Sequence, residues 1–213
     1  GILQDEYGVR PEEMTWIVTG KDSATQQTGG ASSWENVPPR DMHLERAPAG
    51  KDDSDLLLDG QVDAIFHPAE PRAYVERHPQ IERLFPNARQ VERAYFEKTG
   101  IFPIMHVVAI RSQLATEAPG LRKAVFRAYV EAKRLDYQEM KRIRWAYDSL
   151  PWYGQELDRT RSVMGENFYS YGMQQNRKAL ETVLRYSHEQ GLARRRLKVE
   201  ELFHPSTLAL VDA

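Results

Sequence analysis

The chain has 213 residues, of which 41% are hydrophobic and 28% are charged, and it contains no cysteine. This composition is ordinary for a globular protein, and the absence of cysteine excludes disulfides, thiolate catalysis and cysteine-bound metals. A formal net charge of −2 gives no reason to expect nucleic acid or an anionic membrane surface as a partner. Because no apolar run approaches the length of a membrane span, we also expect no membrane insertion.

The first residues are typical of the end of an amphipathic helix. Ile2, Leu3 and Tyr7 fall on one helical face, and Gly8 follows as a cap. A protein rarely begins inside a helix, so we expect the sequence to be the C-terminal two thirds of a longer protein. An N-terminal segment that completes one lobe is then a partner of this chain.

Helices and strands alternate up to residue 100. In chain order we predict a strand over 14–19, a polar loop over 20–53 with a short strand near 42–44, a helix over 54–60 with Asp53 or Ser54 as its N-cap, a buried strand over 62–66, and helices over 72–77 and 87–99. This alternation is the pattern of an α/β protein.

The most apolar segment is residues 101–110. Its β-branched residues predict a strand that is buried on both faces, as in a parallel or mixed sheet. His106 lies in the middle of this segment, and a buried histidine must be hydrogen-bonded because burying it unpaired is costly.

Helices dominate the rest of the chain. We predict one from residue 118 towards 145, an interruption at Pro151, helices over 156–164 and 174–190, and a short element over 199–203. These patterns predict residues 1–100 as an α/β lobe, residues 101–111 as a hinge-crossing strand, and residues 112–213 as the mainly helical remainder of a second lobe.

Several short segments, taken in order, resemble the 4,5-dihydroxyphthalate decarboxylase family. They are residues 1–9, 63–66, 83–86, 91–96, 100–106 (Gly-Ile-Phe-Pro-Ile-Met-His) and 185–192 (Arg-Tyr-Ser-His-Glu-Gln-Gly-Leu). The resemblance implies the two-lobed fold of type II periplasmic binding proteins, with the N-terminal part of one lobe ahead of Gly1. It also implies an enzyme that removes one carboxylate from 4,5-dihydroxyphthalate and yields 3,4-dihydroxybenzoate.

Two histidines are the predicted catalytic residues. His67 follows the predicted strand over 62–66, and open α/β sheets place ligand groups at the carboxyl ends of their strands. The helix that begins near Arg72 is expected to offer unpaired N–H groups to an anion. His106 is the second candidate for acid–base chemistry. The alternatives are that His67 caps a turn and that His106 is a buried histidine holding the lobes together.

Five further residues are predicted to bind substrate. Arg72 and Arg111 suit a carboxylate because a guanidinium binds it in a bidentate manner, with solvated surface residues as the alternative. Trp16 is a candidate for stacking on an aromatic ring, with core packing as the alternative. Thr19 ends the same predicted strand, on the same side as His67, and Glu70 lies beside the turn of His67. The other histidines, including His188, have no neighbours that suggest a site, and 194–196 is expected to be a solvated run of arginines.

The predicted reaction requires no cofactor. A divalent metal held by His67, Glu70 and His106 is the alternative, although no spacing typical of a metal motif is present. The other function that we consider is a solute-binding protein of an ABC-type transporter for a small aromatic or carboxylate ligand. We expect a cytoplasmic location for the enzyme and a periplasmic one for the transport component. Self-association into a homo-oligomer is expected in addition.

Overall fold

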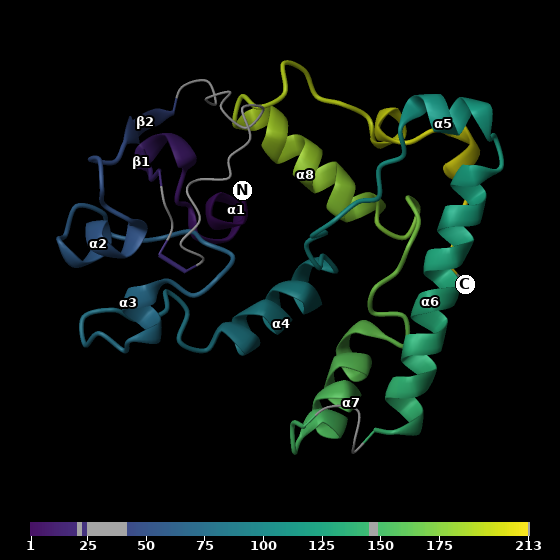
Figure 1. The fold of residues 1–213 in the computed structure, drawn as a ribbon, viewed down its shortest axis with the longest axis horizontal. Coiled ribbons are helices and arrows are strands. Elements are labelled where there is room, and N and C mark those ends of the chain that lie inside the picture. The colour runs from purple at the N-terminus through teal and green to yellow at the C-terminus, as the bar shows by residue number, and fades with distance from the viewer. Residues whose placement is uncertain (21–22, 25–41, 145–148, 213) are drawn as a thin grey trace. The chain divides into compact units, whose positions relative to one another are not determined.

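The computed structural model describes residues 1–20, 23–24, 42–144 and 149–212 (Figure 1). The chain divides into two compact units. The first comprises Gly1–Ala88 and Tyr186–Arg196, and the second comprises Arg89–Arg185 and Leu197–Ala213. The fold is mixed α/β with a small parallel sheet, as the alternation of elements predicted.

A two-stranded parallel sheet lies in the first unit. Strand β1 (Thr15–Val18) pairs with β2 (His43–Arg46), so that Thr15 faces His43 and Val18 faces Arg46. Helix α1 (Ile2–Tyr7) ends at Gly8, whose φ of 71° is left-handed, and the 3₁₀ helix η1 (Pro11–Glu13) leads into β1. The opening helix, its glycine cap and both strands are confirmed.

Two short helices pack together in the same unit. Helix α2 (Asp53–Leu58) begins at Asp52, whose carboxylate accepts the N–H of Asp55 at 2.8 Å. The N-cap is therefore one residue earlier than predicted, because Asp52 is the residue whose side chain reaches the third N–H of the helix. Helix α3 (Arg72–Val75) contacts α2, and Leu56 and Ala73 are each only 1% exposed at this contact.

The predicted strand over 62–66 is wrong. These residues form neither helix nor strand, and Phe66 is 61% exposed. Their first residue instead helps to close α2, since the carbonyl of Leu56 accepts the N–H groups of Gln61 (2.9 Å) and Val62 (3.4 Å). A strand requires a neighbour to complete its hydrogen bonds, and in the described part of the chain β1 and β2 pair only with each other.

The second unit is helical. It contains α4 (Ala88–Thr99), α5 (Ser112–Glu117), α6 (Leu121–Arg142) and α7 (Tyr153–Met164), followed by η2 (Val199–Leu202) and η3 (Pro205–Thr207). The first residue of α4, Ala88, is counted with the first unit. Helix α8 (Arg177–Glu189) begins in this unit and ends in the first. The predicted helices correspond to α4, α6, α7 and α8, whereas α5 was not predicted.

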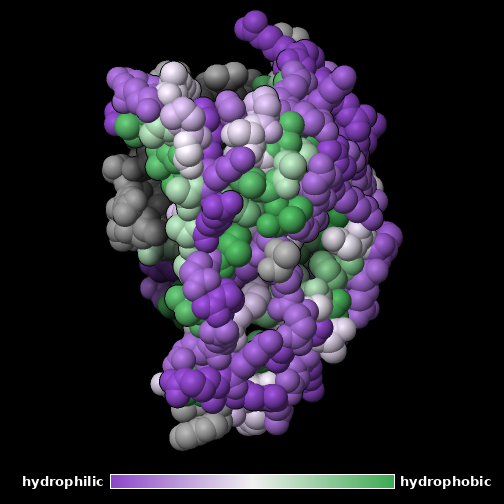
Figure 2. All heavy atoms as spheres, turned by 90° about the vertical axis from the view of Figure 1, so that its right-hand side faces the viewer, coloured by the Kyte–Doolittle hydropathy of each residue, from purple (hydrophilic) through white to green (hydrophobic). Residues whose placement is uncertain are grey.

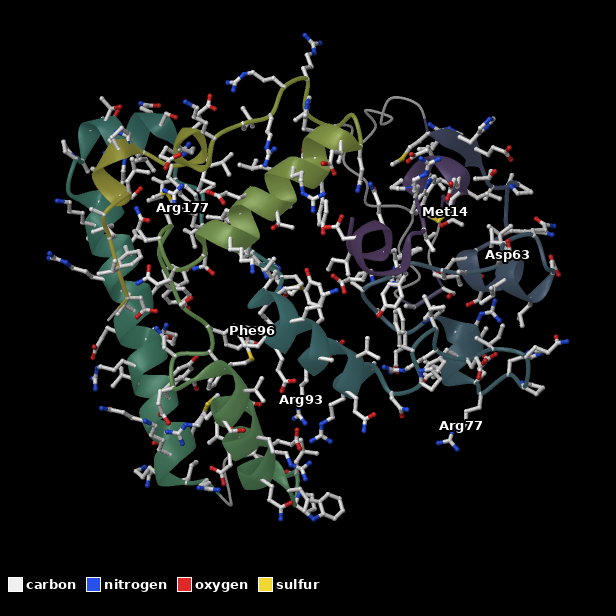
Figure 3. All side chains as sticks on the ribbon, turned by 180° about the vertical axis from the view of Figure 1, so that it is seen from behind. Met14, Asp63, Arg77, Arg93, Phe96 and Arg177 are labelled. Carbon is white, nitrogen blue, oxygen red and sulfur yellow. The ribbon has the colours of Figure 1, made fainter. Side chains whose placement is uncertain are left out.

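Apolar side chains of α8 form the core of the second unit. Leu180 and Leu184 lie one turn apart on this helix and are buried with Met173 and Val199. Elsewhere in the unit an ion pair joins α4 to α7, because Arg93 (labelled in Figure 3) donates to the carboxylate of Glu156 at 3.0 Å.

Helix α6 is the longest helix of the second unit and lies at its surface. Figure 2 shows the face to which α5 and α6 contribute, where hydrophilic side chains predominate and smaller hydrophobic groups lie between them. Tyr129 and Leu135 of α6 are about half exposed, at 48% and 52%. Within the described ranges, no helix combines the length and the apolar character needed to cross a membrane.

The predicted buried strand over 101–110 is also wrong. Gly100, with a φ of 66°, ends α4 as expected, but the following residues are irregular and mostly exposed. Ile101 is buried, whereas Met105 and Val107 are 74% and 73% exposed. The reason is again the lack of a neighbour, since no strand of the described residues pairs with this segment and its backbone is left to solvent.

Arg77 has a strained backbone. Its φ of 55° makes it the one described non-glycine residue in the left-handed region, and its side chain extends away from α3 (Figure 3). We expect Arg77→Gly to raise the free energy of unfolding by about 0.5–1 kcal/mol, because glycine adopts this conformation without a clash of Cβ. Urea denaturation measures the change. Arg77→Ala keeps the Cβ, so an equal gain in that variant would contradict a backbone cause.

Candidate active site

The predicted site residues fall in both units. The first unit contains Trp16, Thr19, His67, Glu70 and Arg72, and the second contains His106 and Arg111.

His67 lies in the turn that precedes α3 and is half-buried. Its Nδ1 accepts the N–H of Ala69 at 3.1 Å, which leaves the proton of a neutral ring on Nε2. The carbonyl oxygen of Ala69 lies 3.0 Å from the same nitrogen and would accept a bond from the other tautomer. His78 accepts the N–H of Gln80 in the same manner at 3.4 Å. The contact therefore shapes a turn, and the second arrangement is the one that a doubly protonated ring, with a proton on each nitrogen, can also adopt.

The side chain of Trp16 packs within the unit. Its ring lies 5.7 Å from that of Phe66, the residue before His67, and its Nε1–H donates to the carbonyl of Pro11 at 3.1 Å. These contacts favour the packing role over free stacking on a ligand. Thr19 follows the end of β1 and is half-buried.

Glu70 is paired with a residue that the sequence did not single out. Its carboxylate accepts from Arg83, whose Nε also donates to the hydroxyl of Tyr74 at 2.8 Å. The pKa of Arg83 is raised, first by the bond to Tyr74 and then by Glu70. Arg83 lies within one of the family-like segments, and that segment was the available signal for it. A ligand that uses Glu70 would compete with Arg83.

Arg72 is held by two carboxylates of the α2 terminus. Its Nη2 donates to Asp52 at 3.2 Å and to Asp55 at 2.8 Å. The pKa of Asp55 is lowered, most strongly by its bond from the backbone N–H of Asp52 and further by Arg72. A substrate carboxylate at Arg72 would have to displace these ion pairs.

The expected unpaired N–H groups at the start of α3 are absent, which corrects the predicted anion site. The N–H of Arg72 donates to the hydroxyl of Ser23 and that of Ala73 to the hydroxyl of Ser54, each at 3.1 Å. The two hydroxyls lie 2.7 Å apart, and both serines are buried. Buried N–H groups must find acceptors, and here side chains distant in sequence supply them. This network fixes the end of the turn that carries His67.

His106 and Arg111 are exposed. His106 lies in the irregular segment 101–110, and Arg111 stands at the N-cap position of α5, where it forms no ion pair with a described residue. In the described ranges no three histidine, aspartate or glutamate side chains gather as a metal site. Of the alternative metal ligands, His67 and Glu70 belong to the first unit and His106 to the second.

Two proteins that carry the same name are similar to this chain. No family model matches the chain. It is 31% identical over 207 residues to 4,5-dihydroxyphthalate decarboxylase of Comamonas testosteroni, which covers 97% of this chain and 62% of that protein. It is also 26% identical over 84 residues to the protein of the same name from Pseudomonas putida, covering 39% of this chain and 31% of that protein. The chain thus spans less than two thirds of the length of these relatives. Over nearly its whole length it is a relative of a 4,5-dihydroxyphthalate decarboxylase, which confirms the family resemblance that its motifs predicted.

Proposed function

We propose that the protein is a decarboxylase of hydroxylated aromatic dicarboxylates that converts 4,5-dihydroxyphthalate into 3,4-dihydroxybenzoate and CO₂. The observation that carries this proposal is the 31% identity to a 4,5-dihydroxyphthalate decarboxylase across 97% of the chain. A similarity that extends along the whole chain supports a common activity better than a match in one motif.

The proposed reaction replaces a carboxylate by a proton. The departing carboxylate is para to a hydroxyl group, and loss of the phenolic proton lets electron density flow to the ring carbon that bears the carboxylate. That carbon accepts a proton, CO₂ leaves, and the electron pair of the broken C–C bond returns to the ring. The protein must supply an acid for the carbon, a base for the phenol and a cation for the remaining carboxylate.

We assign the acid to His67. The carbonyl oxygen of Ala69, 3.0 Å from Nδ1, supports this role, because it would accept the Nδ1–H of the doubly protonated ring, which is the form that gives up a proton from Nε2. His106 is the proposed base. This assignment rests on its place in the segment 101–110 of the sequence. For the remaining carboxylate Arg111 is preferred to Arg72, because Arg72 is held by Asp52 and Asp55. The resemblance further implies a type II periplasmic-binding-protein-like fold with the substrate between its lobes, and we retain this architecture and a cytoplasmic location as parts of the proposal.

The test is CO₂ release by protein made from its complete gene. We expect one CO₂ and one 3,4-dihydroxybenzoate for each 4,5-dihydroxyphthalate consumed, measured by mass spectrometry of the gas and chromatography of the product. Phthalate is the control substrate and should release no CO₂, since it lacks the hydroxyl that drives the reaction. Binding of 4,5-dihydroxyphthalate without CO₂ release would contradict the enzyme and favour the solute-binding alternative. A parallel assay after treatment with EDTA tests for a divalent metal.

A further inference from the structure

Three arginine side chains surround a single carboxylate between α4 and α7 in the second unit. Arg93 extends from α4 towards α7 (Figure 3) and donates to one oxygen of Glu156 at 3.0 Å. The other oxygen of Glu156 pairs with Arg89 of α4 and lies 3.5 Å from the guanidinium of Arg159 of α7. These four residues form an arginine cluster that joins the two helices.

The spacing of the residues places the cluster on one face of each helix. Arg89 and Arg93 are four residues apart on α4, and residues at this spacing are neighbours on a helical surface. Glu156 and Arg159 are three residues apart on α7, which has the same effect. The cluster is open to solvent, with side-chain exposures from 31% for Arg93 to 60% for Arg159. A dissolved anion can therefore reach it.

The cluster has more positive than negative charge. Three guanidiniums face one carboxylate, which leaves an excess of two positive charges. The pKa of Arg89 is lowered, first by partial loss of water around its guanidinium and then by the charges of Arg93 and Arg159. Arg72 shows the opposite balance, because it lies between two carboxylates. Repulsion among the three arginines is thus only partly compensated by Glu156.

A phosphate group fits this cluster in charge and in shape. A phosphate monoester carries a charge of about −1.5 to −2 at neutral pH, which balances the excess of the cluster. Its several oxygens can each accept from a different guanidinium, and a guanidinium binds two such oxygens at once. One carboxylate cannot use all the N–H donors that three arginines offer. Donors for a further anion are therefore present on both helices.

We infer that the arginine cluster binds a phosphate group, either as the free ion or as part of a small phosphorylated metabolite. The phosphate oxygens accept from Arg89, Arg93 and Arg159, in competition with Glu156, and the bound anion ties α4 to α7. None of the residues assigned to the decarboxylation belongs to the cluster, so this inference goes beyond the proposed function.

Calorimetric titration of the protein made from its complete gene with inorganic phosphate, at an ionic strength held constant with sodium chloride, tests the inference. We expect Arg93→Gln and Arg159→Gln each to weaken binding by about tenfold or more, the usual effect of removing a hydrogen bond between charged groups. Glu156→Gln should strengthen binding by about threefold or more, because it removes a negative charge close to the bound anion. Arg134→Gln is the matched control. This exposed arginine of the same unit pairs with Glu131, and its loss should change binding by less than about twofold.

A parallel titration with glycerol 3-phosphate identifies the source of the phosphate group. Tighter binding of the ester than of inorganic phosphate indicates a phosphorylated metabolite, whereas tighter binding of inorganic phosphate indicates the free ion. Either result supports a phosphate site. Phosphate should also raise the midpoint of thermal unfolding of the wild type, and by less in Arg93→Gln, because a ligand stabilises the folded state that binds it.

An ordinary network of ion pairs would give different results. A wild type that binds neither inorganic phosphate nor glycerol 3-phosphate would overturn the inference. Binding that is unchanged in Arg93→Gln and Arg159→Gln, or equally weakened in Arg134→Gln, would overturn it as well. So would weaker binding in a folded Glu156→Gln variant, since the carboxylate would then help the site instead of competing with the anion. Circular dichroism of each variant verifies that the fold is intact.

Discussion

Replacing His67 with alanine is expected to lower turnover by about two to four orders of magnitude, the usual contribution of a positioned acid or base. The KM should change much less, because Arg111, the group proposed to hold the remaining carboxylate, stays in place. The physical reason is that the Nε2 proton of His67 is the one assigned to the ring carbon, and alanine has no proton to give. Steady-state CO₂ release from 4,5-dihydroxyphthalate measures both constants.

Two further variants separate chemistry from the shape of the turn. Asparagine at position 67 still accepts the N–H of Ala69 in an Asx turn but cannot transfer a proton at neutral pH. His67→Asn should therefore be as impaired as His67→Ala. His78→Ala removes a histidine with the same backbone contact, to Gln80, and should keep its activity. Full turnover in His67→Asn would show that His67 only shapes the turn.

The second large effect is expected at Lys133, which lies inside the second unit. Its side chain is 9% exposed and pairs with Asp212, whose side chain is 4% exposed. The ammonium group also donates to the amide oxygen of Asn167 at 2.6 Å and to the carbonyl of Tyr169 at 2.7 Å, and it lies 4.4 Å from the ring centre of Tyr171. All three donors of the lysine are thus used. This contact attaches the C-terminal segment to α6.

Lys133→Met should lower the free energy of unfolding by about 3–5 kcal/mol, because it leaves Asp212 buried without its cation. Chemical denaturation followed by circular dichroism measures the change. The double variant Lys133→Met with Asp212→Asn should recover part of the loss, since it removes the unpaired charge as well. Arg134→Met is the control. It breaks an exposed pair with Glu131 on the same helix and should cost less than about 1 kcal/mol. A loss at Lys133 no larger than that at Arg134 would contradict a buried, stabilising pair.

Acid should weaken the same contact. Burial alone would raise the pKa of Asp212, but the bonds from Lys133, from the N–H of Tyr171 and from Asn167 lower it below the ordinary 3.8. A carboxyl with a depressed pKa in the folded state contributes its stability above pH 3.8, and that stability is lost as the pH falls through the folded value. The free energy of unfolding should therefore depend less on pH in Asp212→Asn than in the wild type. The comparison is made between about pH 5 and pH 2, where carboxyl groups titrate.

Helix positions were predictable from the sequence because their causes are local. The apolar stripe of α8 and the glycines after α1, α4 and α8 depend on residues within a few positions of each other. Strands were not predictable in the same way. Residues 62–66 and 101–110 have the composition of strands but remain irregular, because a strand forms only where a neighbour completes its hydrogen bonds. The short motifs, in turn, were enough to predict the relationship to 4,5-dihydroxyphthalate decarboxylases.

The state of each site residue was decided by the tertiary structure. The sequence indicated Arg72 as an anchor for a carboxylate, but the fold brings Asp52 and Asp55 to its guanidinium. The sequence also left His188 without a role, although it lies in a family-like segment, and the fold brings it together with η1 and Met42 around one pocket. Residue type and local spacing determine which groups are available, whereas the charges, hydrogen bonds and space around them depend on residues far away in the chain. Local pattern therefore determined the helices and the resemblance to these decarboxylases, and long-range packing decided which polar groups are held in ion pairs and hydrogen bonds.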